Sequence, residues 1–121
     1  RKYLRSGRLW QNRFFSCILD TDDYLWCVAR YIENNPVKAG LTHDAESYLW
    51  SSARCHVKGD PDSLLCRPDW LHESAREKYA KFLKEDDERG VDMIRRATRS
   101  GRPLCGPETL LALEGLLNRK F

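Results

Sequence analysis

The sequence has little of what metal and disulfide sites need. Its three histidines, His43, His56 and His72, lie far apart, and no two of them stand at the His-x-His spacing. The cysteines are odd in number, with no CxxC pair and no histidine at zinc-finger spacing. We therefore expect neither a zinc finger nor a disulfide framework. The cysteines, which we interpret as reduced structural thiols, are Cys17, Cys27, Cys55, Cys66 and Cys105.

Long apolar runs are also missing. No stretch approaches the roughly 20 consecutive apolar residues that a membrane helix needs. The basic start, Arg1 to Arg8, is not followed by the apolar core or the small-residue cleavage site of a secretory signal. Hydrophobic residues make up 41% of the chain and charged residues 32%, which is typical of a globular protein in water. We therefore expect a cytoplasmic protein with no membrane partner.

The length limits the organisation of the chain. A sequence of 121 residues is long enough for one modest hydrophobic core and too short for two independent domains. No internal repeat or low-complexity segment is visible. We therefore predict a single domain over residues 1–121.

The net charge of +3 is small, but the basic side chains concentrate at the two ends. A more acidic middle, which includes residues 85–88, separates them. Basic ends fit a polyanionic partner, because Lys and Arg bind phosphates by releasing condensed counterions. A solvated surface of mixed charge explains the same composition. The basic residues are Arg1, Lys2, Arg5, Arg8 and Arg13 near the start and Arg95, Arg96, Arg99, Arg102, Arg119 and Lys120 near the end.

One segment has the pattern of a β-strand. Residues 9–19 hold an apolar, partly alternating run that stops at Asp20. A lone strand leaves its backbone donors and acceptors unpaired, so it implies either a missing sheet or pairing with another chain. A homodimer formed through this strand is one expected assembly.

A helix is predicted to follow the strand. Asp20 and Thr21 are good N-caps, and carboxylates at 22–23 suit the positive end of a helix dipole. We expect this helix to end near Asn34, because the residue before Pro36 is pushed out of the helical region. Residues 36–40 then predict a separate helical turn. The apolar stripe of the helix would be Leu25, Val28, Ala29 and Ile32.

Further short helices are predicted at 51–57, at 74–83, at 92–98 and from 106 onward. The second of these begins with a capping box formed by Ser74 and Glu77. Its buried face would be Ala75, Tyr79, Phe82 and Leu83, and the tryptophans expected in the core are Trp26, Trp50 and Trp70. The chain is thus predicted to be mainly α, with one or two short β-strands.

Four segments, in collinear order, resemble those of one protein family. Residues 30–41 read RYIENNPVKAGL, residues 7–14 read GRLWQNRF and are followed by Ser16, and residues 48–53 read YLWSSA. Residues 96–106 read RATRSGRPLCG, which is similar to the family's ATRxGRPLG stretch with Cys105 inserted. The family is that of the REP-associated tyrosine transposases, relatives of the single-tyrosine HUH transposases that act on single-stranded DNA.

The resemblance implies a fold. The chain would be a small helical domain that corresponds to the C-terminal part of a transposase-like α+β fold. Residues 1–41 would hold a strand and the tyrosine helix, and residues 42–121 would form the helical C-terminal region. The chain is interpreted as a fragment, a truncated gene product or the remnant of a decayed element, and these alternatives stay open.

The resemblance also implies a chemistry. In that family a tyrosine oxygen attacks a DNA phosphodiester and becomes joined to the 5′ phosphate, while a divalent metal, magnesium or manganese, polarises the phosphate. Tyr31 matches the tyrosine, and Asn35, one helical turn later, matches a polar metal ligand. The family's metal is held mainly by a His-x-His pair that this chain lacks. We therefore expect this polypeptide alone to bind no metal and to cleave no DNA.

Binding of single-stranded or hairpin DNA is the expected activity. Aromatic, polar and cationic side chains near the start have the mixture that stacks bases and contacts phosphates. Arginines near the end surround a turn between two predicted helices, which would suit a phosphate grip. The DNA-binding candidates are Arg8, Trp10, Gln11, Asn12, Arg13, Lys38, Arg95, Arg96, Arg99 and Arg102, whereas Glu33 and Asn34 are expected to be solvated.

Two functions are alternatives to DNA binding alone. One is an active nicking and joining transposase, completed by a segment or partner that carries the His-x-His pair. The other is a non-enzymatic module that binds another protein.

Overall fold

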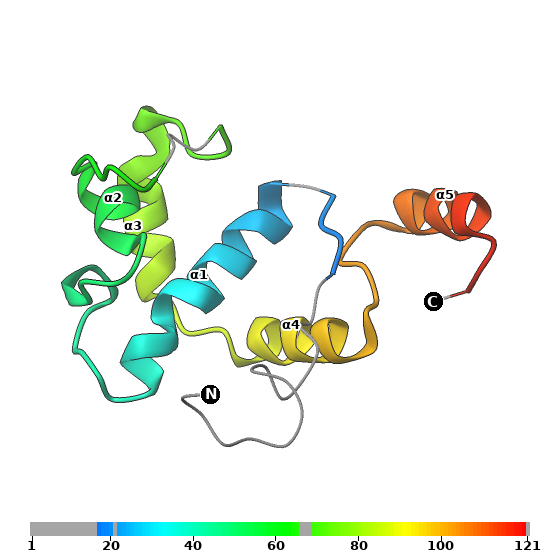
Figure 1. Ribbon diagram of the computed structural model, residues 1–121, viewed down its shortest axis with the longest axis horizontal. Helices are drawn as coiled ribbons and strands as arrows, with labels where there is room; N and C mark the ends of the chain where they lie inside the picture. The colour runs from blue at the N-terminus through cyan, green and yellow to red at the C-terminus, as the bar shows by residue number, and fades with distance from the viewer. Residues whose placement is uncertain (1–16, 21, 66–68, 121) are drawn as a thin grey trace, which may run out of the picture.

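The computed structural model describes residues 17–20, 22–65 and 69–120. These ranges are mainly helical, as the sequence predicts. Figure 1 shows the central helix α1 with α2 and α3 on one side, α4 on the other, and α5 projecting from the far end. The elements are α1 (Asp22–Lys38), the 3-10 turn η1 (Ala45–Ser47), α2 (Ala53–Lys58), the 3-10 turn η2 (Glu73–Ala75), α3 (Arg76–Lys84), α4 (Glu88–Ser100) and α5 (Pro107–Leu117).

Extended pairing is limited to one position within the described ranges. Leu19 and Leu104 form an isolated parallel bridge, and the Leu104 N–H donates to the Ile18 carbonyl at 2.8 Å. This bridge joins the segment before α1 to the segment after α4. Most of the predicted strand, residues 9–16, lies outside the described residues.

Helix α1 does not end where the sequence predicts. It runs through Pro36 to Lys38, so the prediction of an end near Asn34 and a separate turn at 36–40 is wrong. Proline in the last turn removes only one donor, the one that would reach the Ile32 carbonyl. The end is closed by Gly40, whose φ is 76°, and by a bond from the Leu41 N–H to the Pro36 carbonyl at 2.9 Å.

Two other helix starts differ from the prediction. Helix α3 begins at Arg76, and Ser74 lies inside η2, so the expected capping box does not form. Helix α4 begins at Glu88 instead of Asp92, because the Asp87 carboxylate accepts a hydrogen bond from the Gly90 N–H at 2.9 Å. Helix α5 begins at Pro107, as expected.

The interior consists of two clusters, one on each side of α1. The first joins α1 to η1, α2 and α3, with Ala45, Ala53, Leu71, Tyr79 and Leu83 buried. The second joins α1 to α4 and the segment after it, with Ile94, Ala97 and Leu104 buried. The buried face predicted for the 74–83 helix is confirmed, since Ala75 and Phe82 pack against Tyr79 and Leu83.

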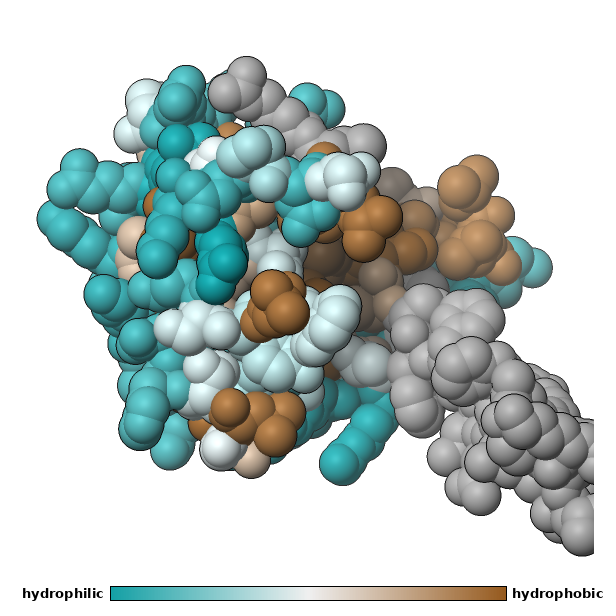
Figure 2. Space-filling view, turned by 60° about the vertical axis from the view of Figure 1, so that its left-hand side comes forward, coloured by the Kyte–Doolittle hydropathy of each residue, from teal (hydrophilic) through white to brown (hydrophobic). Residues whose placement is uncertain are grey.

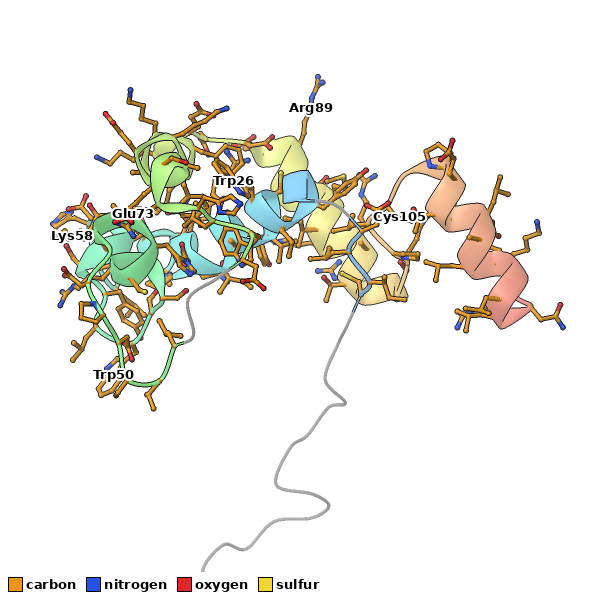
Figure 3. All side chains as sticks on the ribbon, turned by 90° about the horizontal axis from the view of Figure 1, so that it is seen from above. Trp26, Trp50, Lys58, Glu73, Arg89 and Cys105 are labelled. Atoms are coloured by element: carbon orange, nitrogen blue, oxygen red, sulfur yellow. The ribbon has the colours of Figure 1, made fainter. Side chains whose placement is uncertain are left out.

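Because α1 packs on two sides, its predicted single stripe is wrong in part. Ile32 is 57% exposed, while Trp26 and Ala29 pack in the first cluster and Val28 in the second. Trp70 packs in the first cluster as expected, and the Trp26 indole N–H donates to the Trp70 carbonyl at 3.4 Å. The expectation that Trp50 is a core residue is also wrong, because it is 81% exposed and projects from the surface, as Figure 3 shows.

None of the helices in the described ranges is long and apolar enough to cross a lipid bilayer. Four of the cysteines, Cys17, Cys27, Cys55 and Cys105, are not in disulfide bonds, and Cys66 lies outside the described residues.

Candidate functional site

Tyr31 lies on the face of α1 that packs towards α4. It is partly buried and contacts the cluster around Ile94. It also lines a recess of only about 20 Å³ together with the cations Arg30 and Lys38. The carboxylates that line the same recess are Glu85, Asp86 and Asp87. A phosphate entering this recess would therefore meet three carboxylates and only two cations.

Asn35, the expected metal ligand, is exposed one helical turn after Tyr31. Throughout the described ranges, no group of three or more His, Cys, Asp or Glu side chains is placed to hold a metal ion. A lone amide oxygen is a weak site for a hard cation, which takes six or more oxygen ligands. The described residues therefore do not fit the metal that the resemblance implies.

The residues that flank Tyr31 serve the interior. The Arg30 guanidinium is buried; it donates to the Asp87 carboxylate at 2.8 Å and to the Phe82 carbonyl at 3.2 Å. It also stacks on the Phe82 ring, 3.9 Å from its centroid. The Asn34 amide donates to the Leu83 carbonyl at 2.8 Å. These contacts hold α1 against the C-terminal end of α3 and the start of α4.

Glu33 is the most deeply placed charged group of this segment. It is 1% exposed, so the expectation that it is solvated is wrong. Its carboxylate accepts from the Tyr79 hydroxyl at 2.7 Å, lies 2.6 Å from His56 Nδ1, and accepts a short hydrogen bond from the Ser52 hydroxyl. A buried carboxylate needs such partners, because an unpaired charge in the interior is strongly unfavourable.

The same network acts on Tyr79. Burial and the neighbouring Glu33 carboxylate raise the pKa of the Tyr79 phenol far above its ordinary value of 10.0. Trp26, His56 and Trp70 surround its ring at edge-to-face angles. Tyr79 is therefore a neutral hydrogen-bond donor that orients Glu33 and has no role at the surface.

Four arginines of the last third of the chain line a wide groove of about 790 Å³. Three of the candidates, Arg96, Arg99 and Arg102, lie along it with exposed side chains. Arg89, which the sequence argument did not select, joins them from the first turn of α4 (Figure 3). Asp92 is the carboxylate of this groove, and it pairs with Arg96 at 3.2 Å. Four arginines and one aspartate thus line the groove.

Apolar groups complete the groove. Tyr24 from the start of α1, Met93 from α4 and Pro103 from the following segment line it. Cys105 also lines it, and burial, followed by the Asp20 carboxylate, raises the pKa of its thiol above the ordinary value of 9.0. This cysteine is therefore a neutral thiol at pH 7. The groove offers phosphate donors and flat apolar surface side by side.

Two other candidates lie beside a separate hollow of about 460 Å³. Lys38 from the end of α1 and Arg95 from α4 line it, together with Glu88, Arg89 and Asp92. Arg89 and Asp92 are shared with the arginine-lined groove. The structure thus brings Arg96, Arg99 and Arg102 together and places Lys38 and Arg95 on a neighbouring surface.

The turn predicted between the two C-terminal helices is present between α4 and α5, but these helices do not form a helix-turn-helix. Helices α4 and α5 share no extensive packing, and Figure 1 shows α5 extending away from α4. The remaining candidates, Arg8, Trp10, Gln11, Asn12 and Arg13, lie outside the described residues.

Sequence reasoning missed Arg89 and Tyr24 for identifiable reasons. Arg89 precedes Arg96 by seven residues and so shares its helix face, but the predicted start of the helix at Asp92 excluded it. Tyr24 lies close to the apolar stripe of its helix in the sequence, and only the fold brings it beside α4. Comparison with protein-family models, with curated proteins and with solved structures found no match to this chain.

Proposed function

We propose that this chain is a transposase-derived DNA-binding protein that takes single-stranded or hairpin DNA along the arginine-lined groove. The observation that carries the proposal is the gathering of Arg89, Arg96, Arg99 and Arg102 in one open groove beside Tyr24. The four segments that resemble REP-associated tyrosine transposases supply the class of partner. One of these segments, residues 96–106, contributes three of the arginines that line the groove.

The groove suits a single strand better than a regular duplex. Guanidinium groups bind phosphates with two parallel hydrogen bonds, and an aromatic ring beside them gives an unpaired base a surface on which to stack. A base inside a duplex is already stacked on its neighbours and presents no free face to Tyr24. Loops and ends of hairpins offer both a backbone and unpaired bases.

We also propose that this chain alone does not cleave DNA strands. Tyr31 shares its small recess with Glu85, Asp86 and Asp87, and the arginines of the groove do not line that recess. A tyrosine hydroxyl is a weak nucleophile unless the phosphate that it attacks is activated. The described residues do not assemble the ligands for such activation.

A gel-shift titration tests binding. The chain is titrated against a labelled DNA hairpin with a single-stranded loop, against the loop sequence as a free strand, and against a matched duplex, each at several salt concentrations. We expect binding to the hairpin and the free strand that weakens as salt rises. A chain that binds none of the three at low salt contradicts the proposal.

Variants locate the binding surface. Replacing Arg96, Arg99 and Arg102 by Ala should weaken binding about tenfold or more and should lower the slope of log K against log salt by about 2, since each contact with a single-strand phosphate contributes about 0.7. The matched control replaces Lys58, Lys78 and Lys81, three exposed cations of α2 and α3, and should bind nearly as well as the parent. Equal losses in both variants would mean that charge alone, and not the groove, drives binding.

The same DNA also tests the enzymatic alternative. Incubation with magnesium or manganese, followed by denaturing electrophoresis, would reveal a covalent protein–DNA adduct. We expect none. An adduct that forms with the parent chain and disappears in Tyr31→Phe would instead support an active nicking enzyme.

A further inference from the structure

Helix α5 carries an apolar surface that the rest of the described chain leaves uncovered. Leu111 is 66% exposed and Leu116 81%, and none of the residues of α5 is buried. Leu117, on the opposite side of the helix, is 49% exposed. Figures 1 and 3 both show α5 clear of the other helices, and Figure 2 shows hydrophobic residues gathered at this projecting end. Exposure of several large apolar side chains on one short helix is typical of an interaction surface.

The exposed side of α5 has a definite composition. At 100° per residue, five exposed residues fall on one face of the helix. Small residues occupy its centre, leucines flank them, and a carboxylate stands at the N-terminal end. A Cβ added at Gly115 would meet no atom within 4 Å, so a neighbouring backbone has room to approach there. The residues are Glu108, Leu111, Ala112, Gly115 and Leu116.

We infer that this face, here called the α5 face, binds the α5 face of a second copy of the chain in antiparallel orientation. A two-fold axis passes between Leu113 and Glu114. It places each residue opposite the residue of the second copy that lies equally far from this midpoint on the other side. Leu111 then lies opposite Leu116 of the second copy, and Ala112 lies opposite its Gly115. The face is thus complementary to itself, as a two-fold interface requires.

The charged residues at the two ends of α5 favour a second copy of the chain as the partner and an antiparallel orientation. Glu108 lies in the first turn of α5, and Arg119 and Lys120 follow its C-cap, Asn118. The antiparallel arrangement places Glu108 at the end of the second copy that carries Arg119 and Lys120. Antiparallel pairing also sets the positive end of one helix dipole beside the negative end of the other. A parallel pair would bring like charges together at both ends.

The size of α5 sets the strength of this dimer. Eleven residues at about 1.5 Å each give a helix of only about 16 Å. Two such helices bury less than the roughly 1,200 Å² of a stable standard interface. We therefore expect a reversible dimer with a dissociation constant of about 10 to 500 μM. It does not depend on the proposed binding of DNA.

Sedimentation of the full chain at several concentrations, without DNA, tests the inference. The parent chain should shift from a monomer of 14.2 kDa towards twice that mass as its concentration rises. Leu116→Asp should weaken the dimer about tenfold or more, because it places a charge in the apolar contact. Leu64→Asp is the matched control, since Leu64 is 91% exposed and lies outside α5, and it should leave the dimer unchanged.

Two further variants separate loss of pairing from loss of the helix. Gly115→Gln should favour the isolated helix, because Gln is a better helix former than Gly, yet it should block the close approach of the two backbones. Glu108→Lys should weaken the dimer, and the double variant Glu108→Lys with Arg119→Glu should restore it. Restoration by the charge swap would identify both the surface and its antiparallel direction.

Three outcomes would overturn the inference. The parent chain would stay monomeric over the whole concentration range, as expected if α5 is covered by other residues of the chain or by another protein. Alternatively, a dimer would form but persist in Leu116→Asp and Gly115→Gln, which would assign it to another surface. A dimer weakened equally by Leu64→Asp would show general apolar association.

Discussion

At the scale of single residues, some side chains of segment 30–34 bind groups in the interior and others do not. Arg30, Glu33 and Asn34 each bind groups of α2, α3 or the loop before α4. Tyr31 and Ile32 point elsewhere, Tyr31 towards α4 and Ile32 largely to solvent. Much of the sequence pattern that resembles a catalytic signature is therefore accounted for by the packing of α1.

Tyr79 gives this interior a predicted pH dependence. The pKa of its phenol is raised above the ordinary value of 10.0, so the folded chain holds this proton more tightly than the unfolded chain. Its contribution to stability is fully present below about pH 10 and is lost as the pH rises towards the folded-state pKa. Urea unfolding at pH 8 to about 11 should show stability falling at the alkaline end.

Tyr79→Phe serves as the control for that titration. The variant should be less stable at pH 7 by about 1–2 kcal/mol, because Glu33 loses a hydrogen bond of 2.7 Å. Its stability should also fall less steeply above pH 10 than that of the parent. If both proteins show the same alkaline slope, another group is responsible.

At the scale of elements, Asp87 links two helices. One carboxylate oxygen caps α4 through the Gly90 N–H, and the other accepts from Arg30 of α1. Gly90 belongs to the same arrangement, because a Cβ at that position would collide with the Asp87 carboxylate. The start of α4 is therefore fixed by a contact with α1 as well as by local capping.

Replacing Asp87 should separate these two contributions. Asp87→Ala removes the cap and the closer carboxylate of Arg30, at 2.8 Å, and leaves only Glu85 at 4.0 Å, which should cost about 2–4 kcal/mol. Asp87→Asn keeps an oxygen acceptor and removes only the charge, so it should cost about half as much. Urea unfolding measures both, with Asp86→Ala as a neighbouring exposed control that should change stability by less than about 0.5 kcal/mol.

A destabilisation as large in Asp86→Ala as in Asp87→Ala would contradict this account. So would equal losses in the Ala and Asn variants, because the amide would then contribute nothing as a cap. Either result would assign the start of α4 to residues other than Asp87.

At the scale of the whole molecule, α1 separates two unlike halves. The half with α2 and α3 encloses the aromatic and polar interior around Tyr79 and Glu33. The half with α4 carries the arginine-lined groove on its outer side. Figure 1 shows α5 beyond both halves, reached through the segment that follows α4.

This arrangement predicts a gradient of local stability. Amide hydrogen exchange should be slowest in α1, which packs on two sides, and fastest in α5, which has no buried residue. Raising the protein concentration should slow exchange in α5 and leave α1 unchanged, because the inferred dimer covers only α5. Uniform protection along the chain at low concentration would contradict the gradient.

Local chemistry explains how much of the fold the sequence reveals. Pro107 marks the start of α5 through its own fixed φ and missing N–H, so that position can be predicted directly from the sequence. The sequence predicts the start of α4 at Asp92, whereas the Asp87 cap, held by Arg30 from 57 residues away, starts the helix at Glu88. Pro36 predicts a helix end, but the last turn of a helix tolerates proline.

The sequence by itself determined the helical class of the chain, most of its helices and the clustering of basic residues near its C-terminal end. Tertiary structure alone decided that Glu33 is buried with Tyr79, that Trp50 is exposed, and that Arg89 and Tyr24 join the arginine-lined groove. The physical reason is the distance along the sequence over which each kind of interaction acts. Helix propensity and capping act over a few residues, whereas burial depends on partners such as Tyr79, which lies 46 residues from Glu33.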